Sequence, residues 1–486
     1  MRSIRALMIA ALGLAMFAGV PARAAGCTAE AHAGGEWPSY GGDLANTRNQ
    51  ASESTIDASN VASMVPAWTF SFAGESADGN IQAPPVTGGG CLFVASDTGW
   101  VVGLDADSGD LAWKTQYPVG GQVAGIFGLA VADGRVYGAS VDQAGPFAFA
   151  LDAATGIEEW RSEPFPEIGT TINSSTVLYD GVLLIAGWGD DPDPTAHSGY
   201  ALVDAATGGI LELVHVIPED HWDEGYAGGG IWGTTAIDPE HGFGYVGTAN
   251  PYSKRNEHDH TNAIVKIDLN RGSESFGQIV GFYKGTYDNY VPGAYDNPVC
   301  QTAPEIPEGS YNLSCLQLDI DFGASPSVWA DGEGRPIVGA LQKAGIFHAA
   351  YADTMEEAWT NVLSAPLLLG NASTATVIDD QVVVSANPGL VWSMDDTSGS
   401  ASWIAPTLDG VRYQAMASAN GVVYTVDGNG NLHAIDAATG MPLLQRSVST
   451  DAGTTASILS SPSVSIARNK VYAPAGGGLA AYGLPA

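Results

Sequence analysis

The sequence predicts an all-β fold, an eight-bladed β-propeller, and two observations predict it. A motif of the form Asp-x-x-x-Gly, flanked by short apolar strands, occurs eight times if a last degenerate copy is included. Most successive copies lie 41 to 52 residues apart, which is the length of a blade of three to four short strands. The alternative, a two-sheet sandwich, does not explain a repeat that continues over more than 350 residues.

Each copy predicts a strand, a tight turn and a second strand. The clearest copies are GLDADSGDLAW (103–113), ALDAATGIEEW (150–160) and SMDDTSGSASW (393–403), where Trp stands eight positions after the Asp. Another strand pair precedes the turn, as in GRVYGAS (134–140) and GVVYTVDGNGNLHAID (421–436). The Asp of the motif is assigned to Asp105, Asp152, Asp204, Asp268, Asp353, Asp395 and Asp436, and the degenerate copy LAAYG lies at 479–483.

Two stretches depart from the regular repeat. AWTFSF (67–72) precedes the first copy, and we expect it to be a strand that helps to close the ring. Asp268 and Asp353 are 85 residues apart. An insertion beside one blade of a regular ring is where a functional site is expected.

The N-terminus predicts export. MRSIRALMIAALGLAMFAGVPARA has two arginines, an apolar run and a small-residue cleavage pattern, so residues 1–24 are assigned as a signal peptide and 25–486 as the propeller domain. A buried N-terminal helix and a lipoprotein attached at Cys27 are the alternatives. No second long apolar run is present, so no membrane span is predicted. The predicted location is periplasmic or secreted.

An oxidising compartment makes the four cysteines candidates for disulfides. Cys300 and Cys315 bracket a loop rich in Pro and Asn, and we expect them to pair, which leaves Cys27 with Cys91. Three connectivities remain open at this point.

The formal charge, 18 − 53 = −35, argues against nucleic acid or an anionic membrane surface as a partner. With 45% hydrophobic residues and 12 Trp, the chain can still bury a large core.

The stretch LDIDFGASP (318–326) has the pattern of a strand, which would place Asp319 and Asp321 on one face. Two adjacent carboxylates repel each other unless water or a cation lies between them. A solvated strand edge and a cation site are the two interpretations that the residues alone leave open.

The repeat resembles that of the pyrroloquinoline quinone (PQQ) alcohol dehydrogenases, whose propeller has eight blades with a Trp-docking motif. EWPSYGGDLANTRNQ (36–50) is similar to the segment that enters their first blade, and IWGTTAIDPEHGFGYVGTANP (231–251) to their motif ending in Gly-Thr-x-Asn-Pro. A cysteine loop followed by Asp-x-Asp-Phe-Gly at 319–323 is most similar to the polyvinyl alcohol dehydrogenase branch. The resemblance covers nearly the whole chain after residue 24.

The resemblance implies a PQQ site. Trp232 matches the floor under the quinone, and Lys343 matches the cation that hydrogen-bonds the quinone oxygens. Gln82 and Thr171 align with residues that hold the PQQ carboxylates, although the best-studied members have Glu at the first position.

The resemblance also implies a metal ion and a base. Asn250 matches the amide ligand and Asp321 a second carboxylate, while Asp191, with Asp190 as the alternative, stands where the family has Glu. Oxygen ligands suit Ca²⁺ or a lanthanide. Asp319 matches the catalytic base.

The implied reaction is the oxidation of a secondary or polymeric alcohol to a ketone or aldehyde. The sequence contains no Cys-x-x-Cys-His haem motif and no adjacent Cys-Cys pair. Electrons are therefore expected to pass to a separate acceptor, a soluble c-type cytochrome. The rival hypotheses are a non-catalytic propeller that serves as an envelope scaffold or binding protein, and a propeller that has lost its chemistry.

Overall fold

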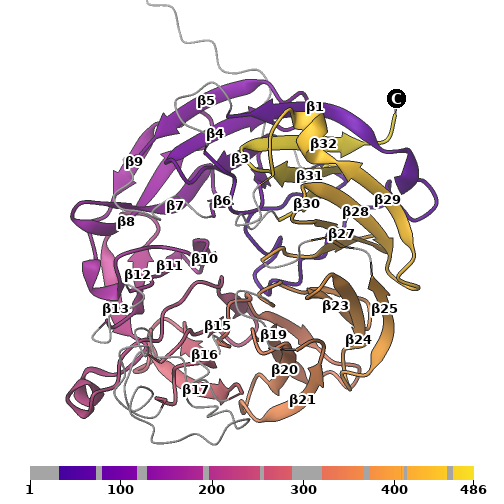
Figure 1. The fold of residues 1–486 in the computed structure, drawn as a ribbon. Coiled ribbons are helices and arrows are strands. Elements are labelled where there is room, and N and C mark those ends of the chain that lie inside the picture. Colours follow the sequence, from indigo (N-terminus) through magenta and orange to yellow (C-terminus); the bar gives the residue numbers. More distant parts are fainter. Residues whose placement is uncertain are drawn as a thin grey trace, which may run out of the picture.

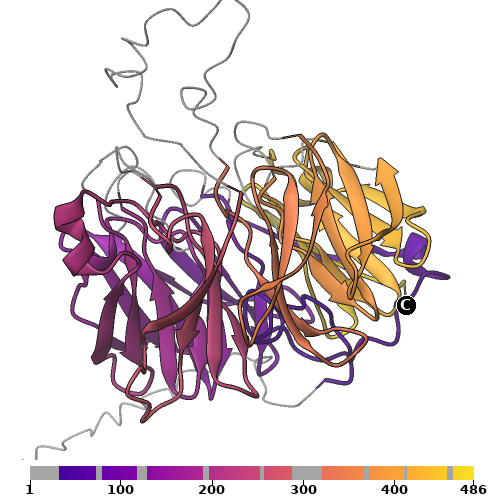
Figure 2. The same ribbon diagram turned by 90° about the horizontal axis from the view of Figure 1, so that it is seen from below.

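The computed structural model describes residues 32–72, 79–117, 128–189, 196–251, 257–286, 320–365, 371–406, 408–409, 413–456 and 463–485. In these residues the strands form eight antiparallel sheets of four strands each. The sheets are arranged as a ring (Figure 1), and Figure 2 shows the ring from the side, as a thick disc whose strands run between its two faces. The predicted all-β, eight-bladed propeller is confirmed.

Each blade is a meander whose first strand lies near the centre of the ring and whose last lies at the rim (Figure 1). Blades 1 to 4 comprise β2 (Val86–Gly88), β3 (Cys91–Ala95), β4 (Trp100–Asp105) and β5 (Leu111–Gln116); β6 (Ala130–Ala132), β7 (Arg135–Asp142), β8 (Gly145–Asp152) and β9 (Glu158–Arg161); β10 (Val177–Tyr179), β11 (Val182–Ala186), β12 (Gly199–Asp204) and β13 (Ile210–His215); and β14 (Ala236–Asp238), β15 (Phe243–Gly247), β16 (Ala263–Asp268) and β17 (Ile279–Lys284).

The second half of the ring repeats this arrangement. Blades 5 to 8 comprise β18 (Ser327–Ala330), β19 (Pro336–Leu341), β20 (Ile346–Tyr351) and β21 (Glu357–Val362); β22 (Thr376–Ile378), β23 (Gln381–Ala386), β24 (Leu390–Asp395) and β25 (Ala401–Pro406); β26 (Ala417–Ala419), β27 (Val422–Val426), β28 (Asn431–Asp436) and β29 (Pro442–Ser447); and β30 (Ser465–Ala467), β31 (Lys470–Ala475) and β32 (Gly478–Gly483) with β1 (Val65–Ser71). The short helices are η1 (Val61–Ser63), η2 (Pro166–Ile168), η3 (Glu219–Glu224) and α2 (Val448–Ala452).

The ring is closed by strands from opposite ends of the described chain. β1 pairs antiparallel with β32, with Val65 opposite Gly483 and Ser71 opposite Gly478. The expected closing strand at 67–72 therefore exists, and it completes the eighth blade, whose other three strands come from the C-terminal end.

The repeated Gly and Trp hold neighbouring blades together. The indole of Trp113, on β5, donates to the carbonyl oxygen of Ala153 in blade 2 at 2.9 Å. The ring packs on Gly156, which has φ 69° and where a Cβ would lie 2.3 Å from the indole. Both the left-handed turn and the contact therefore require Gly. The same docking is made by Trp68, Trp160, Trp359 and Trp403 on Gly109, Gly208, Gly399 and Gly440.

The assignment of Asp353 to the motif is wrong. The first residue of the blade 5 turn is Tyr351, whose N–H bonds to the carbonyl of Glu356 and whose carbonyl accepts from Met355 N–H at 2.7 Å. Met355, with φ 61°, occupies the position that Gly holds elsewhere. Trp359 then stands eight residues after the start of the turn, as in the other copies. The hydrogen-bond register, and not the nearest Asp, defines the repeat.

The two seams beside blade 4 are held differently. On β13, Glu212 takes the position that Trp113 has on β5, and β17 contains no Trp. Between blades 4 and 5, the Lys266 ammonium instead donates to the carbonyl oxygens of Ala352 (2.9 Å) and Asp353 (3.1 Å). Polar side chains thus replace indole docking where the ring carries its longest insertion.

An N-terminal segment, residues 34–50, contacts the centre of the ring. The carbonyl of Trp37 accepts from Thr87 N–H on β2 at 2.8 Å, and that of Leu44 accepts from Ile237 N–H on β14 at 2.7 Å. Arg48 is fully buried, and its guanidinium donates to carbonyl oxygens of blades 7 and 8. Further carbonyl–amide bonds of this kind join Pro38 to Val131, Ala45 to Val328, Thr47 to Val377, Arg48 to Ser418 and Gly35 to Arg468.

Hydrophobic side chains fill the spaces within and between adjacent sheets, in clusters that follow one another around the ring. Among the described residues, the helices are all too short or too polar to cross a bilayer.

Candidate functional site

Four of the residues singled out from the sequence come from the same end of blades 4 and 5. Trp232 precedes β14 and Asn250 follows β15, while Asp321 precedes β18 and Lys343 follows β19. In an antiparallel meander, the start of the first strand and the end of the second lie at one end of the sheet. The topology therefore places all four on one face of the ring, at its inner edge.

The prediction of a strand over 318–326 is wrong for the residues that the structure describes. Residues 320–326 form no strand, and β18 begins at Ser327. The segment instead crosses the inner end of blade 4. The Ser325 hydroxyl accepts from Thr234 N–H at 2.8 Å, and a Cβ at Gly323 would lie 2.3 Å from the indole of Trp232. Contacts with blade 4 thus replace a β-ladder, and Asp319 lies outside the described residues.

Lys343 and Asp321 form a buried ion pair. Lys343 Nζ lies 2.7 Å from Asp321 Oδ1, and the side chains are 7% and 1% exposed. The backbone N–H of Lys343 also donates to the carbonyl of Asp321 at 2.9 Å. Each charge would be costly to bury alone, so the pair is stable only as a unit or with another charged partner.

The same ammonium lies over an aromatic face. Lys343 Nζ is 4.4 Å from the ring centroid of Trp232. The edge of Tyr413 meets the Trp232 ring at a centroid distance of 5.8 Å. A half-buried flat ring with a cation above it suits a planar anionic ligand, because stacking and charge act on the same molecule. Asp321 and the buried Asn250 add oxygen atoms of the kind that hard cations bind. The described residues therefore fit PQQ and an oxygen-bound metal ion in their chemistry.

Gln82 and Thr171 contact their own blades. Gln82 Nε2 donates to Asp97 Oδ2 at 3.2 Å, and Asn80 donates to the same oxygen. The Thr171 hydroxyl donates to the carbonyl of Trp188 at 3.2 Å. Both residues precede the inner strands of blades 1 and 3, at the same end as Trp232. Lys343 therefore contacts both Asp321 and Trp232 directly, whereas Gln82 and Thr171 are held by local bonds.

Several predicted residues lie outside the described part of the chain: Asp190, Asp191, Asp319, Cys27, Cys300 and Cys315. Cys91 is buried and disulfide-bonded, and the pairing of the cysteines stays a prediction. Within the described ranges, no group of three His, Cys, Asp or Glu side chains is arranged to hold a metal ion. Of the proposed metal ligands, Asn250 and Asp321 belong to the described residues.

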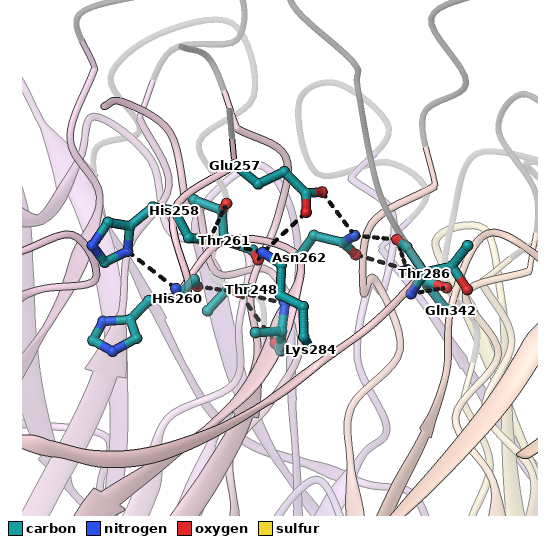
Figure 3. A network of polar contacts seen from close by, with 10 residues as sticks. Thr248, Glu257, His258, His260, Thr261, Asn262, Lys284, Thr286 and Gln342 are labelled. Carbon is teal, nitrogen blue, oxygen red and sulfur yellow. Dashed lines mark hydrogen bonds and ion pairs between the residues drawn. The ribbon is translucent and has the colours of Figure 1, made fainter. Parts of the chain in front are cut away.

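Sequence reasoning missed two residues of this region, Tyr413 and Gln342. Tyr413 is isolated in the sequence from every other site residue. Gln342 directly precedes Lys343, and that adjacency was the one available signal. Figure 3 shows the Gln342 side chain in a polar network with Asn262 and Thr286 of blade 4.

Comparisons with known proteins agree with this architecture. A family model described as "Outer membrane protein assembly factor BamB" matches residues 52–212 and 317–484. A polyvinylalcohol dehydrogenase of Sphingopyxis sp. (strain 113P3) is 24% identical over 485 residues, an alignment that covers 87% of this chain and 69% of the relative.

Two solved structures share the fold. The quinohemoprotein alcohol dehydrogenase of Comamonas testosteroni superposes with a TM-score of 0.68 at 17% identity, covering 92% of this chain and 80% of the other. A europium-containing methanol dehydrogenase superposes with a TM-score of 0.69 at 15% identity, covering 92% and 98%. At such identities the similarity shows the architecture alone.

Proposed function

The chain belongs to the PQQ-dependent alcohol dehydrogenase family, within the wider propeller family described as outer membrane protein assembly factor BamB, and from this premise we propose that it oxidises a secondary or polymeric alcohol to a ketone or aldehyde. The observation that carries the proposal is the buried Lys343–Asp321 pair over the face of Trp232. A polymeric substrate is favoured by the similarity to polyvinylalcohol dehydrogenases.

PQQ is held by four residues in this proposal. Trp232 stacks under the tricycle, Lys343 donates to its quinone oxygens, and Gln82 and Thr171 hold its carboxylates. When bound, PQQ supplies the two-electron acceptor that no protein side chain provides. The Lys343 ammonium would stabilise negative charge on the quinone oxygens, because a metal ion bound beside it would share its counter-charge, Asp321.

The metal ion is bound by Asn250, Asp321 and a carboxylate from Asp191 or Asp190. All of these are oxygen donors, which Ca²⁺ and lanthanides prefer. A second carboxylate at Asp321 favours a trivalent ion.

Asp319 is the proposed general base. An alcohol hydroxyl has a pKa far above neutrality, so its proton must be removed as hydride leaves the carbon. Asp319 precedes the proposed ligand Asp321 by two positions in the sequence, and it matches the catalytic base of the PQQ alcohol dehydrogenases. A neighbouring cation would keep Asp319 ionised at neutral pH.

The protein acts in the periplasm or outside the cell in this proposal, after removal of residues 1–24. A disulfide between Cys300 and Cys315 closes the loop that precedes Asp319. The electrons pass to a soluble c-type cytochrome, since the sequence carries no haem-attachment motif.

The second candidate is a non-catalytic envelope scaffold or binding protein, which the description of the matched family model favours. A scaffold has no need of a buried charge pair beside an aromatic face. The Lys343–Asp321–Trp232 contact therefore supports the enzyme over the scaffold.

Reconstitution tests the proposal. Apoprotein from a host that lacks PQQ is titrated with PQQ in the presence of Ca²⁺ or La³⁺, and dye-linked oxidation of secondary alcohols and polyvinyl alcohol is measured. Wild type should bind PQQ and oxidise alcohol, and Lys343→Met should lose both. Lys470→Met is the control, because Lys470 pairs with Asp107 in a different blade. Wild type that binds no PQQ with either metal would favour the scaffold.

A further inference from the structure

The candidate site is divided between two blades. Trp232 and Asn250 belong to blade 4, whereas Asp321 and Lys343 flank the first two strands of blade 5. The seam between these blades lacks the docked Trp that fixes most other seams. Other contacts must therefore set the spacing between the two halves of the site.

Gln342 provides such contacts at the end of the seam where the site lies. Its side chain is fully buried. Nε2 donates to Asn262 Oδ1 at 2.7 Å and to the carbonyl of Thr286 at 3.0 Å, and Oε1 accepts from Thr286 N–H at 3.3 Å. Figure 3 shows the three residues facing one another, with Asn262 also bonded to Glu257. A blade 5 amide is thus satisfied by blade 4 partners.

His348, on β20, fixes which way this amide faces. Its Nε2 lies 3.0 Å from Gln342 Oε1, and its Nδ1 lies 3.0 Å from the Tyr283 hydroxyl. Burial lowers the pKa of His348 to about 4, so the ring is neutral at pH 7. The Gln342 amide donates through Nε2 to Asn262 and Thr286, so its Oε1 accepts from His348 Nε2–H. The Tyr283 hydroxyl beside Nδ1 also donates to Glu357 Oε2 at 3.0 Å. The backbone of Thr286 requires the same orientation of the amide, because its N–H donates to Oε1 and its carbonyl accepts from Nε2.

The amide is linked to the site through one peptide bond. Gln342 begins the turn that ends at Gly345, whose N–H donates to the Gln342 carbonyl at 2.9 Å. Lys343, the next residue in this turn, holds Asp321 with both its backbone N–H and its ammonium. A shift of the Gln342 side chain relative to blade 4 therefore moves Lys343 and Asp321 relative to Trp232.

We propose that Gln342 is a positioning residue, an amide clamp between blades 4 and 5 that sets where Lys343 and Asp321 stand relative to Trp232 and Asn250. The expected effect on PQQ binding and turnover rests on the proposed function. The expected effect on the position of Lys343 and Asp321 rests on the contacts alone. The Gln342 side chain is fully buried among Asn262, Thr286 and His348, so its proposed effect on the site is indirect. A misplacement of about 1 Å in such a site lowers turnover by up to about a hundredfold.

Gln342→Met tests the clamp, because Met has nearly the length of Gln and no amide. Asn361→Leu is the matched control. Asn361 Nδ2 donates to the Gly399 carbonyl at 2.7 Å, so it is also an amide that crosses a seam, between blades 5 and 6. Both variants should lose some thermal stability. Only Gln342→Met should speed hydrogen exchange at the Lys343 N–H by about tenfold or more and weaken PQQ binding by about tenfold or more.

The outcomes separate the two proposals. Equal exchange rates at the Lys343 N–H in Gln342→Met and Asn361→Leu would overturn the clamp. If Gln342→Met does not fold, Gln342→Glu takes its place, because it keeps the size but sets an acceptor against Asn262 Oδ1. Its protection at the Lys343 N–H, taken relative to the intrinsic exchange rate at each pH and to Asn361→Leu at the same pH, should rise again as low pH protonates the new carboxyl. Wild type that binds no PQQ overturns the proposed function only, because the exchange comparison needs no cofactor.

Discussion

At the scale of single residues, the site depends on charges that are stable only in pairs. Asp321 is 1% exposed, and its partner Lys343 is nearly as deeply buried. Asp321→Asn leaves the ammonium without its counter-charge, and removing one partner of a buried pair costs about 3–5 kcal/mol. We expect a loss of that size in urea unfolding. Any preference for La³⁺ over Ca²⁺ in PQQ reconstitution should disappear in the same variant. If the variant has wild-type stability and an unchanged metal preference, Asp321 is neither the stabilising partner of Lys343 nor a metal ligand.

Asp319→Asn tests the proposed base, because it preserves the shape of the side chain and removes its basicity. A positioned carboxylate contributes roughly 10²- to 10⁴-fold to proton transfer. We expect PQQ and metal to bind as in wild type while kcat falls by about a hundredfold or more. Single-turnover kinetics in D₂O and H₂O measure the step directly. If the variant turns over alcohols at the wild-type rate, another group removes the proton.

His348 predicts how stability depends on pH. Burial lowers its pKa from 6.5 to about 4, so the unfolded chain binds a proton more readily than the folded one between these values. The stability linked to this neutral histidine is fully present above pH 6.5 and is lost as the pH falls toward 4, by on the order of 3 kcal/mol. In urea unfolding from pH 4 to 7, the unfolding free energy of His348→Gln should depend less steeply on pH than that of the wild type.

At the scale of elements, the Asp-x-x-x-Gly turn is a docking device between blades. Gly156→Ala combines a left-handed φ of 69° with a Cβ 2.3 Å from the indole of Trp113. Gly134→Ala, with φ 76° and no atom within 4 Å of its Cβ, carries the backbone strain alone. Strain in the left-handed region costs roughly 1–2 kcal/mol, and overpacking adds about 1–3 kcal/mol. Urea unfolding should therefore show the larger loss for Gly156→Ala. Equal losses of unfolding free energy in the two variants would mean that the Trp113 side chain moves aside without destabilising the protein.

The same elements show what a sequence can and cannot predict. The blade count followed from the repeat, because every blade must bury the same faces against its neighbours. Asp353 was misassigned because its blade has Tyr351 in place of the usual Asp and Met355 in place of the usual Gly, while the hydrogen bonds of the turn are kept. Residues 320–326 alternate like a strand, yet they form contacts with blade 4 that no local pattern encodes. Trp232 and Lys343 were found through a family resemblance, whereas Gln342 acts across a seam that only the fold creates.

At the scale of the whole molecule, electrostatics oppose compactness. A net charge of −35 concentrates like charges when the chain folds, and self-repulsion destabilises the compact state. Salt shortens the screening length from about 10 Å at 0.1 M to about 3 Å at 1 M. Calorimetry should therefore show a melting temperature that rises between about 0.05 M and about 1 M NaCl. A melting temperature independent of salt would show that the carboxylates lie too far apart to interact.

Residues 34–50 also have a consequence for how the protein is made. This segment leaves the ribosome before the blades do, but its partners on β26 and around Arg468 are synthesised more than 360 residues later. Contacts so distant in sequence form slowly, because a long loop must close before they stabilise anything. During synthesis the segment therefore lacks its partners from the later blades, and Trp37 and Arg48 are still exposed to other chains. Residues 34–50 are therefore fully covered, and protected from association with other chains, only when the last blade has formed.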